Sequence, residues 1–277
     1  MIIQASLAIF IFALVPLAIK STNASAITIC FIRLLMTVGI LSLIWARKIQ
    51  FKYREKSFKK LVVLGIVFFF HWISYAYAVK LGGPSIGVLG LSTYGIQLLV
   101  ASSLFLGHKI SRAELFCLIL CAIGVVLIVP SWQLANDSTI GGILALFSAT
   151  CFAFIPILHK NSQEYNRETR IFFQFFGAFV CFSLFVGSTK WSHLNLHDWG
   201  MLIFLGLFGT LIAHSFWAHI TTKISPTAAG MSYYSIAPIT LVLSHFFLGE
   251  RFSFTQILGA IIVIASAMWS SYNSKQS

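Results

Sequence analysis

Charged residues are scarce in this chain. Aspartate, glutamate, lysine and arginine make up 9% of its 277 residues, whereas a typical water-soluble domain carries about 25%. Hydrophobic residues make up 58%. This composition excludes an ordinary water-soluble fold and predicts a protein that lies within a lipid bilayer.

Acidic residues are the rarest of the charged residues, and none falls near the middle of a predicted membrane helix. The seven lie in predicted loops or near helix ends: Glu55, Glu114, Asp137, Glu164, Glu168, Asp198 and Glu250. These positions argue against a carboxylate-based proton relay or sodium site, and against a polyamine or quaternary-ammonium substrate, which needs a negative counter-charge. For proton coupling the histidines are the candidates, because their ordinary pKa lies near neutrality.

The cysteines predict neither a disulfide framework nor a metal site. None lies in an outer loop, where a disulfide would be expected. All five lie inside hydrophobic segments: Cys30, Cys117, Cys121, Cys151 and Cys181. Cys117 and Cys121 share a helix face, but no histidine or aspartate lies near them to complete a set of ligands. The chain also lacks an ATP-binding motif. We therefore expect no metal and no cofactor, and any driving force must come from a gradient.

Long apolar runs fill most of the chain. About 20 helical residues are needed to cross a bilayer, and these runs are apolar on every side rather than alternating as barrel strands do. The sequence therefore predicts an all-α membrane protein with ten transmembrane helices. Their expected bounds are 2–19, 25–45, 61–80, 84–107, 112–130, 139–159, 168–187, 198–222, 226–247 and 253–272.

The net charge of +12 is compatible with nucleic-acid binding, but basic residues in a membrane protein mostly record its topology. With a cytoplasmic N-terminus, fourteen of the nineteen lysines and arginines fall on the cytoplasmic side and four fall outside. We therefore predict that both termini are cytoplasmic, in a bacterial-type cytoplasmic (inner) membrane, and expect no nucleic-acid partner. The basic run 47–60 is read as a topology determinant, with binding to anionic lipid headgroups as the alternative.

The chain is also self-similar. Residues 12–20 match 152–160 at an offset of 140, and residues 106–111 match 248–253 at an offset of 142. Two repeats of five helices follow, over 1–131 and 139–273. Because five is odd, the second repeat must cross the membrane in the opposite sense to the first. Inverted repeats are a recurring plan of secondary transporters.

The five-plus-five plan, an arginine in the second segment and the Leu-Gly-Glu-Arg turn at 248–251 resemble the EamA type of the drug/metabolite transporter superfamily. The resemblance covers nearly the whole chain. The second repeat has Pro238 and Glu250 as the family does, whereas the first has Ile96 and His108 instead. Proteins of this kind mostly export amino acids, other metabolites or drugs, and some import, so the resemblance implies a transporter.

Arg33 is the first candidate for substrate binding. It lies about eight residues into the second segment, where a charge costs several kcal/mol unless it is paired or wetted. We expect it to face the interior and to contact a substrate carboxylate or phosphate, because a guanidinium presents a flat fork of donors. The alternative is a structural role in tying helix ends. The repeat places Gln174 at the corresponding position, so the two are expected to line one cavity.

An aromatic and histidine cluster is the second candidate. The third segment contributes His71, Trp72 and Tyr75, and the repeat sets these against His214 and Trp217 in the eighth. Helical spacing brings these side chains onto shared faces, which favours a cage for a flat or amphipathic substrate. Ordinary helix packing is the alternative.

Segments four and nine add further polar candidates. Polar groups at the ends of buried side chains in a membrane require hydrogen-bond partners. We therefore expect four more side chains in the cavity: Tyr94, Gln97, Tyr234 and His245. Three prolines inside predicted helices are candidate bends for gating: Pro16, Pro156 and Pro238.

Together these features predict a secondary active transporter that works by alternating access, with export as the expected direction. Because the only fixed charge expected in the cavity is positive, the substrate should be a zwitterionic or anionic amphipathic metabolite such as an amino acid. The expected partners are this solute and the lipid bilayer, with protons as a candidate coupling ion; monomer and homodimer both remain open. The alternatives are a membrane-embedded enzyme, for which no catalytic cluster is found, and a passive channel or interaction subunit.

Overall fold

The structure, a computed structural model, describes residues 2–49, 55–107, 109–129, 133, 136–221 and 234–273. All regular secondary structure in these residues is helical. Five of the described helices are long and apolar enough to cross a membrane, by length and composition. The all-α membrane fold expected from the sequence is therefore confirmed.

The first half of the chain forms five helical elements. They are α1 (Ile2–Ser21), α2 (Ala26–Ile44), α3 (Glu55–Leu91), α4 (Tyr94–Leu106) and α5 (Arg112–Ile128). The second half repeats this series with more interruptions. Its described residues form α6 (Asp137–Lys160), α7 (Arg167–Ser183), two short 3-10 turns (Val186–Ser188 and Trp191–His193), α8 (Leu196–Gly206), a π-helix (Leu207–Ile212), α9 (Ala213–Thr221), α11 (Ile236–Leu248) and α12 (Phe254–Asn273).

Side-chain caps explain why several helices begin where they do. Ser25, Asn136 and Asn166 each accept a hydrogen bond from a backbone N–H in the first turn of the following helix. Ser111 and Asn195 go further, because each forms a reciprocal capping box with an acidic residue three positions later. Glu114 and Asp198 are therefore explained in part as helix caps, which agrees with their expected position near helix ends.

The third and fourth predicted helices differ from the expected pair of straight spans. The chain kinks at Gly83, whose φ of 88° and ψ of 166° are not helical, and α3 then continues from Pro84 to Leu91. A turn at Ser92 and Thr93 separates this piece from α4. Both hydroxyls donate to backbone oxygens, of Val88 and Gly90 respectively, which competes with a regular helix at this point. The expected span 84–107 is thus two shorter helices.

The second repeat shows related departures. The expected span 198–222 contains the π-helix at 207–212 between α8 and α9. The expected start of the ninth span, near Pro226, lies outside the described residues. Its described part, α11, ends at Gly249, whose φ of 69° and ψ of 19° nearly equal the 71° and 18° of Gly107 after α4. This shared left-handed cap is the clearest local sign of the repeat.

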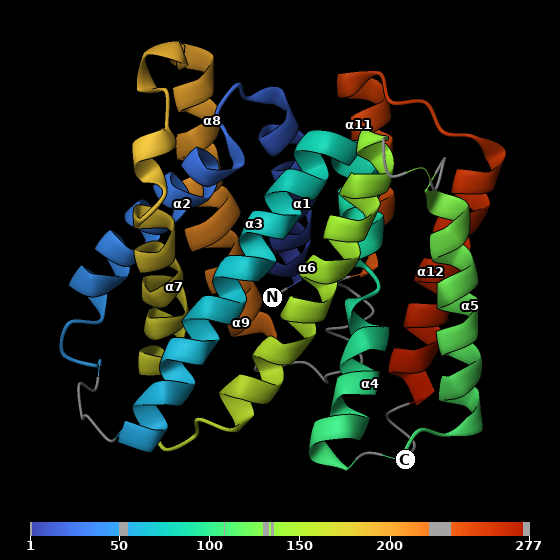
Figure 1. The fold of residues 1–277 in the computed structure, drawn as a ribbon, viewed down its shortest axis with the longest axis horizontal. Coiled ribbons are helices and arrows are strands. Elements are labelled where there is room, and N and C mark those ends of the chain that lie inside the picture. The colour runs from blue at the N-terminus through green and yellow to red at the C-terminus, as the bar shows by residue number, and fades with distance from the viewer. Residues whose placement is uncertain are drawn as a thin grey trace.

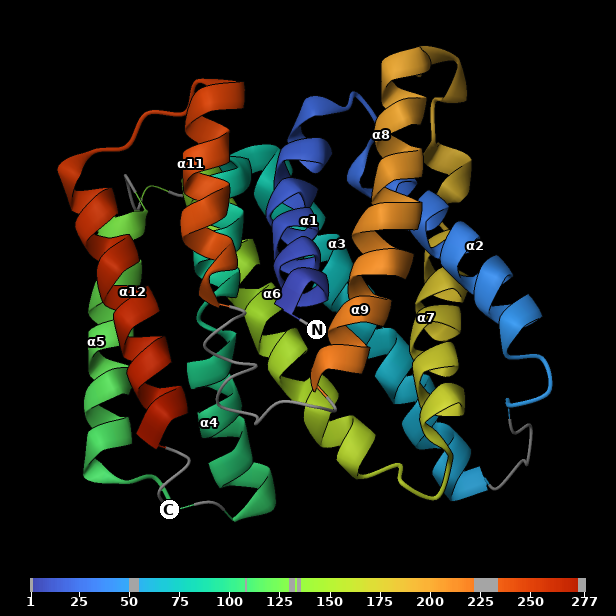
Figure 2. The same cartoon turned by 180° about the vertical axis from the view of Figure 1, so that it is seen from behind.

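The connections gather at two ends of the bundle (Figures 1 and 2). We call the basic end the one where α2 leads to α3, α4 to α5 and α6 to α7; it carries most of the lysines and arginines. The opposite end holds the α1–α2, α7–α8 and α11–α12 connections and the kink of α3. Because α1 runs toward the opposite end and α6 runs toward the basic end, the two halves run in opposite senses.

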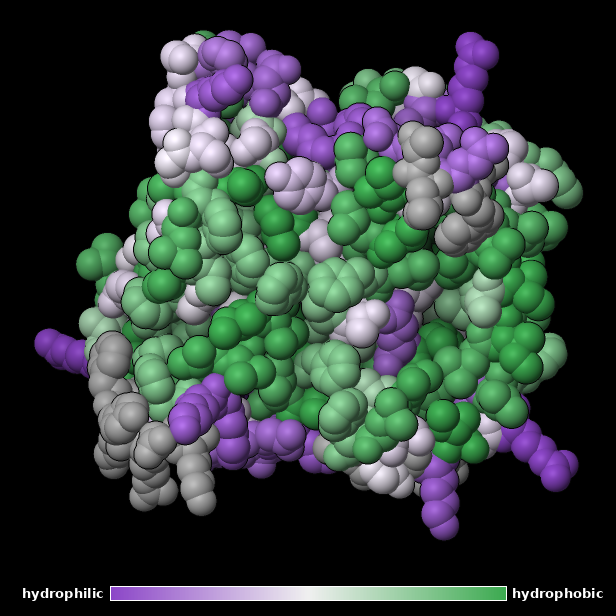
Figure 3. Space-filling model, in the orientation of Figure 1, coloured by the Kyte–Doolittle hydropathy of each residue, from purple (hydrophilic) through white to green (hydrophobic). Residues whose placement is uncertain are grey.

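Apolar side chains cover the sides of the molecule between these ends. Figure 3 shows a broad hydrophobic band with hydrophilic residues gathered above and below it. Large apolar side chains in the band are well exposed, among them Leu104, Phe105, Phe116 and Ile257. Such a surface is stable in contact with lipid tails rather than with water, so the protein is an integral membrane protein.

Candidate functional site

A cavity of about 250 Å³ lies inside the bundle between the two repeats. Its walls come from α1, α2, α3, α6, α7, the π-helix, α9 and α11. Among the residues that line it are Arg33, His71, Trp72, Tyr75, Gln174, His214 and Trp217. Seven of the eleven side chains predicted to bind substrate therefore meet around one space, although they come from four separate parts of the sequence.

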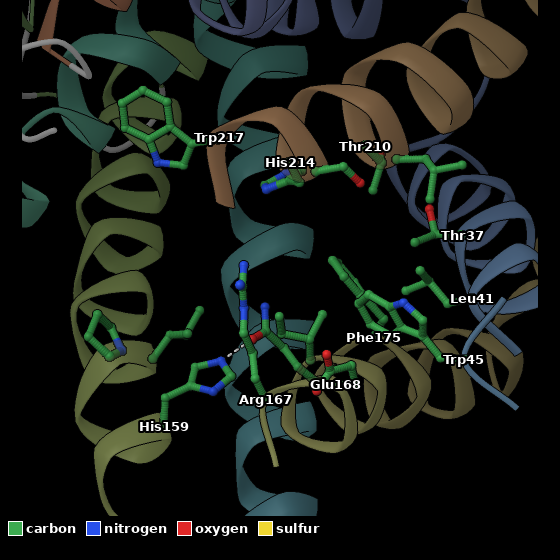
Figure 4. A pocket seen from close by; sticks show the side chains of 16 residues that line it. Thr37, Leu41, Trp45, His159, Arg167, Glu168, Phe175, Thr210, His214 and Trp217 are labelled. Atoms are coloured by element: carbon green, nitrogen blue, oxygen red, sulfur yellow. Dashed lines mark hydrogen bonds between the residues drawn. The ribbon is translucent and has the colours of Figure 1, made fainter. Parts of the chain in front are cut away.

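A larger cavity of about 640 Å³ adjoins the first toward the basic end. The two share Gln174, His214 and Trp217 as lining residues. The larger cavity reaches Trp45 after α2, His159 near the end of α6, and Arg167 and Glu168 in the first turn of α7. Figure 4 shows the last three along one edge, with Thr210 and His214 along the deep edge. The central cavity is thus reached from the basic end.

Arg33 is held firmly at the deep end of this space. Its side chain is only 5% exposed, its Nε donates to Thr210 Oγ1 at 3.0 Å, and its Cζ lies 4.1 Å from the ring centroid of Trp72. The indole face stabilises the guanidinium through a cation–π interaction. These contacts occupy one nitrogen and one face of the group. In the described part of the chain, Nη1 and Nη2 donate to no acceptor, so they are available to a ligand in the cavity.

The π-helix explains how Thr210 reaches Arg33. The Thr210 hydroxyl donates to Leu205 O at 2.8 Å, five residues earlier, and so uses its only hydrogen within its own helix. Its lone pairs remain to accept from Arg33. A π-helical turn is rare and is frequently found at functional sites. Here it places Gly209, Thr210 and Leu211 along the cavity walls.

His71 is tied to α6 through Ser148. Its Nδ1 lies 2.8 Å from Ser148 Oγ and 3.1 Å from Ser148 O, while Ser148 Oγ donates to His71 O at 2.9 Å. The ring also stacks on Phe152, with centroids 4.7 Å apart. His71 is 6% exposed, so its position is set by packing on all sides except toward the cavity.

Gln174, the counterpart of Arg33 in the repeat, faces both cavities. Its Oε1 lies 2.6 Å from His159 Nε2, and Arg170 Nη1 donates to His159 O at 2.8 Å. Arg33 and Gln174 both line the central cavity. Gln174 is however already engaged by a histidine, while Arg33 keeps two nitrogens open.

The opposite end is closed by contacts between the repeats. Glu250, in the α11–α12 turn, accepts a hydrogen bond from Ser85 just after the Gly83 kink, and Ser85 also contacts Ser244 at 3.0 Å. A side chain at Gly83 would collide with the Glu250 carboxylate. The kink and the glutamate of the other repeat are therefore fitted to each other.

A second set of contacts closes the same end over α1. Asp198 Oδ1 accepts from Thr22 Oγ1 at 3.0 Å and from Asn23 N at 2.7 Å. Lys80 donates to Thr22 O, and Lys20 donates to Lys80 O at 2.6 Å. The α1–α2 connection is thus held to both α3 and α8, and the cavity is sealed on this side.

Four predicted site residues lie away from the two cavities. Tyr94 and Tyr234 pack against each other with ring centroids 6.2 Å apart. Gln97 donates to Thr93 Oγ1 at 2.8 Å and to Leu146 O at 3.3 Å, which ties α4 to α6. His245 is exposed at the opposite end, with Nδ1 2.8 Å from Glu250 O. Gln97 and His245 therefore have hydrogen-bond partners outside the cavities, and the two tyrosine rings pack together.

The three prolines predicted to gate occupy different settings. Pro16 and Pro156 lie within continuous helices, α1 and α6, and Pro156 lines the larger cavity. Pro238 is the third residue of α11, in a first turn where its missing N–H costs no helical hydrogen bond. Pro156 alone of the three borders the space described above.

Several cavity residues were not singled out from the sequence. Thr210, His159 and Ser148 each bond a predicted residue, and Arg167 and Glu168 line the entrance. Thr210 and Ser148 resemble ordinary small polar residues of membrane helices. His159 lies within the repeated segment 152–160, but nothing in the sequence separated it from the other histidines near helix ends. The described residues contain no cluster of three or more histidine, cysteine or acidic side chains able to hold a metal ion.

Comparison with known proteins matches the chain to one family over nearly all its length. The model of the EamA-like transporter family matches residues 1–129 and again 139–272. Two curated relatives are the uncharacterized transporter YyaM of Bacillus subtilis (strain 168), 20% identical over 86% of this chain and 84% of its own, and the pseudopaline exporter CntI of Pseudomonas aeruginosa (strain UCBPP-PA14), 25% identical over 76% and 74%.

A solved crystal structure has the same fold. It superposes with a TM-score of 0.64 at 15% sequence identity and covers 99% of this chain and 97% of its own. At this identity the likeness concerns the fold alone. The two matched segments coincide with the two halves of the helical bundle described above.

Proposed function

Because this chain belongs to the EamA-like transporter family, whose members are transporters rather than enzymes, we propose that it is a secondary active carrier of a small organic metabolite. The substrate is an amino acid or a similar zwitterionic or anionic amphipathic solute. It binds in the central cavity between the repeats, and the protein carries it across the membrane by alternating access. The family excludes the alternative of a membrane-embedded enzyme.

The observation that carries this proposal is the state of Arg33. Its Nε and its face are occupied by Thr210 and Trp72, while Nη1 and Nη2 donate to no acceptor among the described residues and the side chain lines the central cavity. A buried guanidinium is stabilised when an anion takes these donors, and its fork matches a carboxylate. A purely structural arginine would be expected to spend all its donors on the protein.

The rest of the cavity suits an amphipathic solute. The central cavity has aromatic walls around Arg33, including Phe68, Trp72, Tyr75 and Trp217. These rings bury apolar surface and also offer edges and faces to a polar group. Glu168, at the entrance, is the only acidic side chain among the described residues that line the two cavities. A cationic substrate would therefore lack a counter-charge beside Arg33.

The direction of transport follows from the charge of the two ends. The basic end faces the cytoplasm by the positive-inside rule, which places both termini there, in a bacterial-type inner membrane. The cavity is then open to the cytoplasm and closed to the outside. A substrate loads from the cytoplasm and leaves after the contacts of Glu250 and Asp198 open. The relative CntI is an exporter by name, and we assign export to this chain as well.

Coupling and assembly complete the proposal. Three histidines line the two cavities, His71, His159 and His214, and they are the groups through which protons would couple to transport. Both repeats and the whole cavity belong to one chain, so a monomer contains everything that alternating access requires. A homodimer would place two such carriers side by side.

Thermal unfolding of the purified protein tests the binding site. Metabolites with a carboxylate should raise the apparent melting temperature, whereas matched amines without one should not, because a ligand that binds only the folded state stabilises it. Arg33→Ala should abolish this stabilisation. Arg112→Ala, which removes an exposed arginine at the start of α5 that lines neither cavity, is the control and should preserve it. Stabilisation that survives in Arg33→Ala would assign Arg33 a structural role.

Counterflow in proteoliposomes tests the carrier itself. Uptake of the labelled solute should saturate, and unlabelled solute trapped inside should accelerate it. A passive channel would show neither property, and an interaction subunit would show no uptake at all.

A further inference from the structure

The surroundings of His71 determine which of its two ring nitrogens carries the proton. Ser148 Oγ has one hydrogen, and it is used in the 2.9 Å hydrogen bond to His71 O. Ser148 O is a carbonyl and can only accept. Both atoms near His71 Nδ1, at 2.8 and 3.1 Å, are therefore acceptors, and Nδ1 must be the donor. In the neutral imidazole the lone pair then resides on Nε2.

That lone pair is left for the cavity. His71 lines the central cavity together with Arg33, Trp72 and Tyr75. It is nine-tenths buried, and in the described part of the chain its Nε2 has no hydrogen-bond partner. A buried nitrogen with an unused lone pair favours a ligand that carries a donor.

The cavity therefore has two poles. Arg33 presents only donors, and its position is set by Thr210 and by the face of Trp72. His71 directly precedes Trp72 on the same helix and lines the same cavity, and Nε2 is the ring nitrogen that Ser148 does not engage. A purely anionic solute would satisfy the first pole and leave the second unpaired.

We propose that His71 is a specificity-determining residue, which selects solutes that carry an N–H donor beside their anionic group, and that Ser148 positions it by holding its proton on Nδ1. The inference rests on the proposed function, because it assumes that the anionic group lies at Arg33. It narrows the substrate class from anions and zwitterions to zwitterions such as α-amino acids, with the ammonium group at His71 Nε2.

Matched pairs of ligands test the inference with the full-length purified protein. Each pair differs only in the amine: phenylalanine with 3-phenylpropionate, leucine with 4-methylpentanoate, and glutamate with glutarate. Apparent dissociation constants come from titrations of the melting temperature. For the pair that binds, the amino acid should bind about 10-fold to 100-fold more tightly, as expected for a hydrogen bond to a charged donor.

Two variants separate this role from folding. His71→Phe removes the acceptor and should reduce the ratio within a pair to about one, while the affinity of the carboxylate without an amine stays unchanged. His71→Asn should do the same with less loss of stability, because the short amide can still donate toward Ser148 but places nothing where Nε2 lies. His193→Phe, at an exposed histidine near the start of α8, is the control and should keep the wild-type ratio.

The outcomes distinguish the two proposals. Equal binding of both members of a pair by the wild type, or a ratio that persists in His71→Phe and His71→Asn, would overturn the role of His71 and leave the carboxylate site at Arg33 standing. Absence of stabilisation by every acid and amino acid would overturn the proposed function itself, and this inference with it.

Discussion

Thr210 lies in the π-helix and binds Arg33, the buried charged group of the cavity. It accepts from Arg33 Nε at 3.0 Å and donates to Leu205 O, and it is fully buried. The hydroxyl hydrogen points to Leu205 O, and the lone pairs of the oxygen remain to accept from Arg33. Together with the face of Trp72, this small side chain sets the direction of the guanidinium fork.

Thr210→Val should weaken the binding of carboxylate ligands about 5-fold to 50-fold. Valine keeps the shape but leaves Arg33 Nε without its acceptor, which costs about 1–3 kcal/mol at a buried donor and frees the fork to turn. Ligand titrations of the melting temperature measure the effect.

Thr240→Val is the matched control for this change. Thr240 is equally buried and donates to Ala13 O at 3.1 Å, but it lines neither cavity. It should lower the melting temperature of the unliganded protein without changing ligand affinity. Equal losses of affinity in both variants would contradict the role given to Thr210.

Close helix crossings hold the helices of the bundle together. A methyl group added at Gly65 of α3 would lie 2.7 Å from the Cα of Gly177 in α7, and one added at Gly124 of α5 would lie 2.9 Å from Gly259 O in α12. In a membrane, where helices gain little from burying apolar surface against each other, such close packing of small residues is a main source of association.

Gly65→Ala should destabilise the protein by about 1–3 kcal/mol, because backbone atoms of α7 cannot move aside as a flexible side chain would. It should also reduce ligand binding, since α3 and α7 carry His71 and Gln174. Thermal unfolding in detergent measures the first effect.

Gly39→Ala supplies the comparison. Gly39 lies in α2 with nothing within 4 Å of an added methyl group, so the change should be neutral or slightly stabilising. Similar melting temperatures for Gly65→Ala and Gly39→Ala would show that the crossing is looser than the structure indicates.

Among the described residues, the larger cavity lies toward the basic end, while contacts between the repeats hold the opposite end together. The closure relies on few polar contacts, chiefly those of Glu250 with Ser85 and of Asp198 with Thr22 and Asn23. Each joins one repeat to the other. A carrier must break these bonds once per transport cycle. They should therefore be strong enough to hold the opposite end together, yet weak enough to break and form again in each cycle.

Glu250→Ala should shift the protein toward a form open at the opposite end, because Ser85 then loses its charged acceptor. Ser92 lines the central cavity, so Ser92→Cys in a background free of other cysteines can report on access. A membrane-impermeant thiol reagent added outside intact cells should label this cysteine several-fold faster in Glu250→Ala.

Glu164→Ala is the control for the labelling experiment. It breaks the 3.0 Å ion pair of Glu164 with Lys60 at the basic end, away from the closed side. Labelling from outside should not increase. Unchanged labelling in Glu250→Ala would mean that this carboxylate does not hold the closed end. Fast labelling of the Ser92→Cys protein from outside while Glu250 is still present would reverse the proposed orientation.

Much of the fold could be predicted because lipid imposes simple rules. An apolar run of about 20 residues has to form a helix, since no water is present to satisfy its backbone, and a repeated run has to repeat the helix. The matched segments, 12–20 with 152–160 and 106–111 with 248–253, therefore predicted the two halves. The breaks at Ser92–Thr93 and at the π-helix were missed, because both arise from side-chain and tertiary contacts that no hydrophobic pattern records.

The candidate site could be predicted only in part. Arg33 was found from sequence because a charge in a membrane is costly wherever it lies, so it must face partners or water. His245 and His159 could not be told apart in the same way. Each is a histidine near a helix end, yet His159 borders the cavity and His245 faces the opposite end.

The sequence alone thus determined the bilayer setting, the repeat and the presence of a buried positive charge, because these depend on the cost of placing each residue in lipid. The tertiary structure decided which polar side chains share the cavity, which atoms of Arg33 and His71 stay open, and which end is closed. Those properties depend on how each helix is rotated against its neighbours, and the packing of side chains at the crossings sets that rotation.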